Sequence, residues 1–197
     1  MLAFEKQAML GGYNLIAGVD EAGRGPLAGP VVSAAVVLPE NFDVCGINDS
    51  KKLSEKKREA LFPVIKNQAV AFGIGIADHE EIDRINILQA SLLSMKRAVE
   101  DLTLDPDYLL IDGKFAIDST IAQRSVIKGD ALSLSIAAAS ILAKVTRDRI
   151  MADLDVQYPQ YGFKRHKGYP TKAHKEAILT HGPCPVHRKS FKGVKGI

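Results

Sequence analysis

The chain has 197 residues, of which 46% are hydrophobic, and carries a formal net charge of +3 at pH 7. That length and apolar content suit one globular domain over residues 1–197, and no apolar run reaches the roughly 18 residues of a membrane span. The two cysteines are too few for a disulfide framework, so we expect a cytoplasmic protein with no membrane partner.

Hydrophobic periodicity predicts an α/β protein with five strands and several helices. In chain order, the predicted strands cover residues 13–20, 31–38, 69–77, 108–112 and 124–128. The predicted helices are a short one that Ser54 caps and that reaches Pro63, an amphipathic one over 83–102, and a largely buried one over 131–154. Residues 1–12 are expected to be a short lead-in.

The order of these elements predicts how the strands pair. The turn after residue 20 returns as a hairpin, so the first two strands should be antiparallel. The helix over 83–102 is typical of a crossover to a parallel neighbour, which would place the strand 108–112 beside the first one. In the third strand, Gly73 and Gly75 form a small face that should pack closely against another element.

The stretch from residue 15 to residue 30 carries the first candidate site. An apolar strand ends on Asp20 and Glu21, whose carboxylates suit a hard divalent cation. Arg24 follows between Gly23 and Gly25, where the backbone can approach a phosphate closely. Successive strand side chains point to opposite faces, so the two acids can share a metal only if the strand ends or bulges between them. The alternative is a polar strand end that runs into a glycine turn.

Two further aspartates belong to the same hypothesis. Asp112 ends the strand 108–112, and if that strand is parallel to the first, Asp112 and Asp20 reach the same edge of the sheet. Asp130 stands where the N-cap of the long helix belongs, and capping is the alternative explanation for it. Both roles are compatible, because a carboxylate at a buried helix start can also face a metal.

The loop at Lys51 and the C-terminal tail offer weaker signals. Lys51 either contacts a phosphate or belongs to a solvated helix lead-in. Residues 155–197 form a basic extension with one short helix between Thr171 and Gly182, and Tyr169 makes it a candidate cover over a nucleic-acid groove, although a single tyrosine often only packs. Cys184 and His187 have half of a zinc spacing but lack the second pair of ligands.

Four stretches together resemble one family. They are GVDEAGRGPLAGPVV, IDGK, KGDALSLSIAAASILAKVTRD and YGFKRHKGYPTKAH. In these motifs the chain resembles bacterial ribonuclease HII, the type 2 ribonuclease H, from about residue 13 to residue 191. The resemblance implies the ribonuclease H-like fold, a five-stranded mixed β-sheet flanked by α-helices, here with a small helical C-terminal extension.

The resemblance also implies an activity and its residues. The activity is hydrolysis of the RNA strand of RNA/DNA hybrids and cleavage on the 5′ side of a ribonucleotide embedded in duplex DNA. The family's four metal-binding carboxylates match Asp20, Glu21, Asp112 and Asp130; its elements that recognise the ribose 2′-hydroxyl match Gly23, Arg24, Gly25 and Tyr169; and Lys51 matches a residue expected to meet the backbone.

The implied chemistry is two-metal hydrolysis. Four clustered carboxylates repel one another, so two Mg²⁺ or Mn²⁺ ions would neutralise them and clamp the attacking water and the leaving oxygen, giving 5′-phosphate and 3′-hydroxyl ends. Basic residues of the tail would add sequence-independent affinity that falls with salt. Two alternatives are another two-metal nuclease on the same fold, which would also cut all-DNA substrates, and a hybrid-binding module without catalysis.

The chain departs from related proteins at its two ends. No additional N-terminal domain precedes residue 13, which argues against the related ribonuclease HIII. The final segment SFKGVKGI shows no evident sliding-clamp peptide with paired aromatic residues. We therefore expect a monomer with nucleic-acid partners and no clear clamp-binding peptide.

Overall fold

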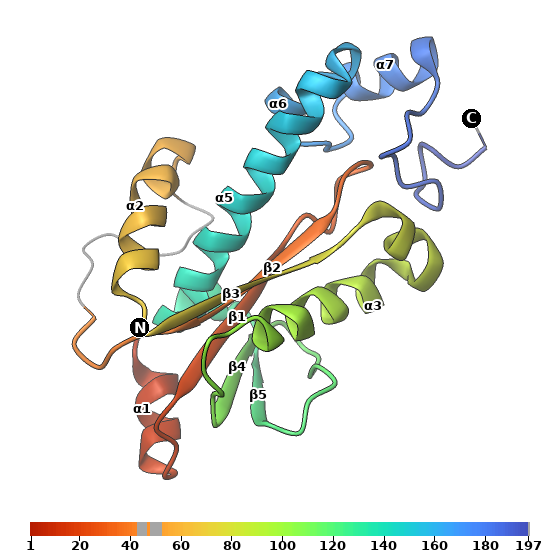
Figure 1. The fold of residues 1–197 in the computed structure, drawn as a ribbon. Coiled ribbons are helices and arrows are strands. Elements are labelled where there is room, and N and C mark those ends of the chain that lie inside the picture. Colours follow the sequence, from red (N-terminus) through yellow and green to blue (C-terminus); the bar gives the residue numbers. More distant parts are fainter. Residues whose placement is uncertain (43–46, 48–52, 197) are drawn as a thin grey trace.

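A five-stranded sheet with the order β3-β2-β1-β4-β5 forms the centre of the protein. In this computed structural model the described residues are 1–42, 47 and 53–196. The strands are β1 (Ile16–Ala22), β2 (Val31–Val37), β3 (Ala71–Ala77), β4 (Tyr108–Asp112) and β5 (Ala122–Val126). β1–β2 and β2–β3 are antiparallel, whereas β1–β4 and β4–β5 are parallel. The predicted mixed sheet, its hairpin and its parallel crossover are confirmed (Figure 1).

Helices cover both faces of this sheet. The long helix α5 (Leu134–Gln157) and α2 (Glu55–Gln68) lie on one face, and α3 (His79–Glu100) lies on the other (Figure 1). The remaining helices are short: α1 (Ala3–Leu10), α4 (Gly129–Leu132), the 3₁₀ turn η1 (Pro159–Tyr161), α6 (Phe163–His166) and α7 (Lys172–His181). One core cluster lies between the sheet and α5 with α2, and a second lies between the sheet and α3.

Glycines in the strands allow the helices to come unusually close. A Cβ on Gly75 would lie 2.0 Å from the carbonyl oxygen of Ser94 in α3, and a Cβ on Gly18 would lie 2.2 Å from the backbone of Ser135 in α5. Side chains at these positions would push each helix away from the sheet. The close packing expected for the small face of β3 is confirmed, and Gly18 places α5 directly over β1.

Several predicted boundaries are wrong, for local physical reasons. α2 continues through Pro63 to Gln68, because its buried stripe at Leu61 and Ile65 extends beyond the proline and outweighs the lost backbone hydrogen bond. Residues expected to be a plain lead-in form α1, whose Glu5 is buried against the start of α5. The predicted crossover helix begins earlier, at His79, since Asp78 and Glu81 form a capping box, and it is kinked at Asn86.

The predicted helix over 131–154 is two helices. α4 ends after Leu132, Ser133 takes extended backbone angles, and its hydroxyl accepts from the amide of Ile136 as the N-cap of α5. Asp130 lies inside α4 and caps neither helix, so its predicted capping role is wrong. By contrast, the predicted cap of α7 by Thr171 and its end at Gly182 are confirmed.

The C-terminal extension packs against the segment that links β1 to β2. Leu27 and Ala28 of that link join Phe163, Ile178 and Cys184 of the extension in one apolar cluster. Two backbone hydrogen bonds join the same segments, from the amide of Leu27 to Gly168 and from Gly29 to Val186. Across the described ranges, no helix is both long and apolar enough to cross a membrane.

Candidate active site

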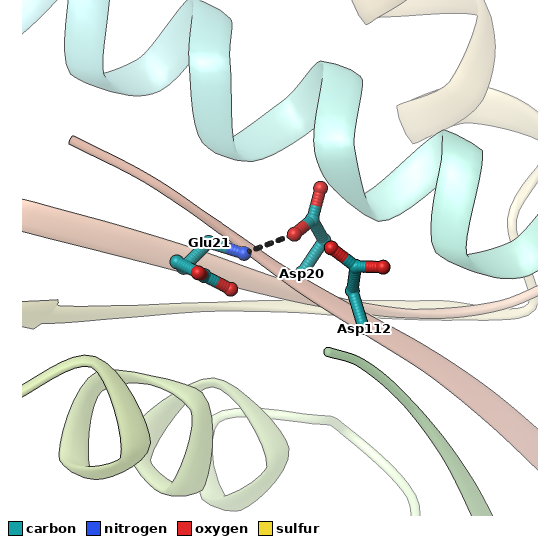
Figure 2. Close-up of side chains that lie close together, drawn as sticks. All are labelled: Asp20, Glu21 and Asp112. Atoms are coloured by element: carbon teal, nitrogen blue, oxygen red, sulfur yellow. Dashed lines mark hydrogen bonds between the residues drawn. The ribbon is translucent and has the colours of Figure 1, made fainter. Parts of the chain in front are cut away.

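Three carboxylates from two neighbouring strands converge at one edge of the sheet. Asp20 and Glu21 lie near the end of β1, and Asp112 is the last residue of the parallel strand β4. One oxygen from each lies within 4.8 Å of the others. Figure 2 shows the three side chains close together beside α5. These three acids are the one cluster of at least three His, Cys, Asp or Glu side chains, among the described residues, that could hold a metal ion. The sequence therefore identified the convergent acids correctly.

The two consecutive acids meet without a break in the strand. β1 pairs with β2 in regular register through Ala22, so the expectation that β1 ends or bulges between Asp20 and Glu21 is wrong. Pairing with β4 stops at Val19, however, and both acids lie beyond the end of that ladder. Asp20 is buried, its Oδ1 accepts from the backbone amide of Glu21 at 2.7 Å, and both carboxylates reach the same edge.

The positive charges near this cluster do not offset the burial and mutual repulsion of its carboxylates. Desolvation raises the pKa of Asp20 well above its usual value, the charges of Glu21 and Asp112 raise it further, and Lys144 opposes them. Burial also raises the pKa of Glu21, although Arg24 counteracts it through a 3.3 Å ion pair with Oε1. Glu21 Oε2 is buried and has no hydrogen-bond partner in the described part of the chain. Hard oxygen ligands with such unsatisfied charge fit a divalent cation.

Asp130 is not a member of the 4.8 Å group. It is buried in α4, and the amide of the preceding Gly129 donates to Asp112 Oδ1 at 2.6 Å. This hydrogen bond fixes the start of α4 against the end of β4. The structure thus brings the backbone beside Asp130 to the carboxylate of Asp112.

The glycine turn and the tyrosine meet in a groove beside the acids. Gly23 has a φ of 101°, which favours glycine, and a Cβ on Gly25 would lie 3.4 Å from the ring of Tyr169. The groove has a volume of ≈ 510 Å³, and its lining includes Glu21, Gly25 and Tyr169. The structure therefore brings the predicted glycine turn and tyrosine together beside the carboxylates.

Positively charged side chains line the same groove. They come from the turn, from α2, from α5 and from the C-terminal extension: Arg24, Arg58, Lys144, Arg165 and Lys167. Some are partly neutralised, since Lys167 Nζ lies 3.1 Å from Glu55 Oε1. The groove thus joins a carboxylate cluster at one side to a basic wall that suits a phosphate backbone.

The comparisons with known proteins decide the family. The sequence model of ribonuclease HII matches residues 17–194. The chain belongs to the ribonuclease HII family. It is 57% identical to ribonuclease HII of Geobacter sulfurreducens, over 98% of this chain and 88% of that protein, and 59% identical to that of Acetivibrio thermocellus, over 97% and 75%. The chain is accordingly an enzyme of the ribonuclease H type.

Solved structures of this family share the fold. The ribonuclease H2 of Pyrococcus horikoshii has a TM-score of 0.76 and 28% identity, over 92% of this chain and 95% of that one. The ribonuclease HII of Archaeoglobus fulgidus, solved in a complex with PCNA, has a TM-score of 0.76 and 25% identity, over 91% and 96%. The ribonuclease H-like fold that the motifs implied is confirmed.

Sequence reasoning missed several residues of this family member's groove. Lys144 of α5 lines the groove and Arg147 is buried, and neither was singled out from the sequence. Arg58 of α2 was not singled out either. A usable signal was their spacing, since Lys144, Arg147 and Asp148 share one helix face at steps of three and four. Lys51 lies outside the described residues.

A chain of imidazoles anchors the backbone of Tyr169. His174 Nδ1 donates to the carbonyl of Tyr169 at 2.9 Å, and His174 Nε2 lies 3.1 Å from His187 Nε2. The amide of Cys184 donates to His187 Nδ1 at 3.0 Å. This pattern requires both buried rings to be neutral, and burial lowers the pKa of His187 to about 4.

Proposed function

We propose that this enzyme hydrolyses the RNA strand of RNA/DNA hybrids and cleaves on the 5′ side of a ribonucleotide embedded in duplex DNA. One observation carries the proposal: the carboxylates of Asp20, Glu21 and Asp112 lie within 4.8 Å of one another, and Glu21 also lines the groove that holds the glycine turn and Tyr169. A metal site and a ribose-reading site therefore share one surface.

The four acids Asp20, Glu21, Asp112 and Asp130 are the proposed ligands of two Mg²⁺ or Mn²⁺ ions. Such ions, when bound, activate the attacking water and neutralise the leaving oxygen, which gives 5′-phosphate and 3′-hydroxyl ends. The protein's part is to hold the ligands at the sheet edge. The unpartnered Glu21 Oε2 and the raised pKa of Asp20 support this assignment.

The proposed ribose reader consists of Gly23, Arg24, Gly25 and Tyr169. A 2′-hydroxyl both donates and accepts hydrogen bonds, so backbone groups of the turn and the Tyr169 hydroxyl can distinguish ribose from deoxyribose without reading a base. Contact between Gly25 and the tyrosine ring supports this proposal, because it places both parts of the reader on one side of the groove.

The basic wall is the proposed site of the nucleic-acid backbone. Arg24, Arg58, Lys144, Arg165 and Lys167 all face the groove, and the last two belong to the C-terminal extension. We include Lys51 in this proposal on the family resemblance alone. Binding through phosphates releases counterions, so the affinity for duplexes should fall steeply as the salt concentration rises.

Cleavage mapping on a duplex with one ribonucleotide tests the proposal. We expect a single metal-dependent cut on the 5′ side of the ribonucleotide, with 5′-phosphate and 3′-hydroxyl ends, and no cut in the same duplex made only of DNA. Asp118→Asn is a matched control for changes to the acids, because Asp118 is an exposed carboxylate paired with Lys96. Cleavage of the all-DNA duplex would favour another nuclease, and binding without cleavage would favour a binding module.

For partners, we propose a cytoplasmic monomer that acts on nucleic acid. The relative from Archaeoglobus fulgidus was solved in a complex with PCNA. Size-exclusion chromatography with light scattering tests the monomer, and a dimer at micromolar concentration would contradict it.

A further inference from the structure

Two buried arginines lie beneath the turn that links β1 to β2. Arg147 of α5 is 2% exposed and Arg188 of the C-terminal extension is 0% exposed. In the described part of the chain, neither guanidinium forms an ion pair with a carboxylate. Both donate instead to main-chain carbonyls, which is an unusual use of a buried charge and requires an explanation.

Arg188 contacts the turn at four carbonyl oxygens. Its Nη2 donates to Gly23 at 2.6 Å and to Pro30 at 3.1 Å, its Nη1 donates to Arg24 at 3.1 Å, and its Nε donates to Gly29 at 2.9 Å. One rigid fork therefore holds both ends of the segment 23–30. A lysine ammonium could not span these carbonyls, because its donors radiate from a single atom.

The direction of these carbonyls fixes the direction of two amides. In a trans peptide the C=O and the N–H point in opposite directions, and the described chain has no cis peptide. The carbonyls of Gly23 and Arg24 point at Arg188, so the N–H groups of Arg24 and Gly25 point away from it. Neither of those amides donates a hydrogen bond elsewhere among the described residues.

We infer that Arg188 is a positioning residue for ribose recognition, which aims the amides of Arg24 and Gly25 at the 2′-hydroxyl of the substrate. This inference rests on the proposed function and deepens it. Both residues line the groove, and a Cβ on Gly25 would lie 3.4 Å from the ring of Tyr169. The positive charge behind the carbonyls also polarises each peptide group, which makes its N–H a stronger donor.

Arg147 joins the turn to the tyrosine segment. Its Nε donates to Pro30 at 3.0 Å, its Nη2 to Ala28 at 3.2 Å and its Nη1 to Lys167 at 3.0 Å. Burial lowers the pKa of Arg188 to about 9, and the neighbouring charge of Arg147 contributes, yet both groups stay charged at neutral pH. The two arginines thus hold the glycine turn and the segment that precedes Tyr169 in fixed positions relative to each other.

Substitution of Arg188 by lysine tests the inference. We expect kcat/KM of Arg188→Lys to fall about tenfold on a duplex with one ribonucleotide, the equivalent of about one hydrogen bond, and about threefold or less on a uniform RNA/DNA hybrid. The hybrid offers many registers, so a misaligned reader costs less there. Arg149→Lys, an exposed arginine of α5, and Val99→Ala, a mild core change, should leave the ratio of the two substrates unchanged.

A merely structural role would lower both activities equally, so an unchanged ratio in Arg188→Lys overturns the inference. If that variant does not fold, the wild-type protein provides the test by NMR in EDTA. The Arg188 Nε–H should exchange slowly, and the amides of Arg24 and Gly25 should shift with the ribonucleotide duplex more than with its all-DNA counterpart. Fast exchange like that of Arg149, or equal shifts, would overturn it.

Failure of the proposed function has a different signature. A wild-type enzyme that does not cut at the ribonucleotide overturns the function and, with it, the role of Arg188. A wild-type enzyme that cuts there, combined with an unchanged substrate ratio in Arg188→Lys, overturns only the role of Arg188.

Discussion

Substitution of Asp112 by asparagine separates its two contacts. Asp112 shares the carboxylate cluster, and its Oδ1 accepts from the amide of Gly129 at 2.6 Å. Asparagine keeps an oxygen for that amide but removes the charge. We expect turnover to fall by orders of magnitude while the fold and hybrid binding are kept.

The Asp112→Asn substitution should change the stability of the metal-free protein only slightly. Two unit charges 4.8 Å apart repel by about 3 kcal/mol at an effective dielectric constant of about 20, before screening and partial protonation reduce the value. Removal of the Asp112 charge should therefore offset the weakened bond to Gly129, and the melting temperature in EDTA should change by no more than about 4 °C. Asp112→Ala loses the acceptor as well, at a cost of about 1–3 kcal/mol, and should melt lower.

Metal binding supplies the third measurement. A cation that binds only the folded wild type raises its melting temperature as its concentration exceeds the dissociation constant, and this rise should shrink in Asp112→Asn. The assays are thermal melts with and without Mn²⁺ and cleavage of a single-ribonucleotide duplex, with Asp118→Asn as control. Near wild-type cleavage at ~1 mM Mg²⁺, an ordinary range for weakly held hard cations, would refute the reasoning.

Three other substitutions or conditions probe the remaining groups. Asp130→Asn should lower turnover by an order of magnitude or more with an unchanged melting temperature, and unchanged turnover would remove Asp130 from the ligand set. Tyr169→Phe should cost about 0.5–1.5 kcal/mol of transition-state stabilisation and Tyr169→Ala about 1–3 kcal/mol more, mainly on the single-ribonucleotide duplex; equal losses on a hybrid would mean that the ring only packs. Because burial lowers the folded-state pKa of His187 to about 4, below the unfolded value of about 6.5, its stabilising contribution is complete above pH 6.5 and declines toward pH 4; melts from pH 7.5 to pH 5 should show a smaller decline in His187→Asn.

The sequence was sufficient for the sheet and for the convergent acids. Strands with strong apolar patterns are visible locally, and the helix between Gly75 and Tyr108 implied the parallel crossover that brings Asp112 beside Asp20. The break between α4 and α5 was not visible, because the apolar run continues through Ser133 and only its backbone angles interrupt the helix.

The supporting cations were the least predictable part. Arginine side chains are mostly exposed in folded proteins, so the sequence offered no reason to expect buried ones. The acceptors of Arg147 and Arg188 are main-chain carbonyls, which no residue type in the sequence marks. A buried arginine with carbonyl partners becomes apparent only when the turn of segment 23–30 has been folded over it. The local pattern thus predicted the convergence of the acids but not the arginines that support the adjoining turn.

Helix α5 connects the two halves of the site. Gly18 lets it lie directly over β1, and small residues along its first half keep it there. Lys144 then lies near enough to lower the pKa of Asp20. Arg147, three residues later and about 4.5 Å along the helix axis, holds the turn that carries the proposed ribose reader. Because one helix carries both cations, a shift of α5 would move the counter-charge of the carboxylates and the support of the turn together.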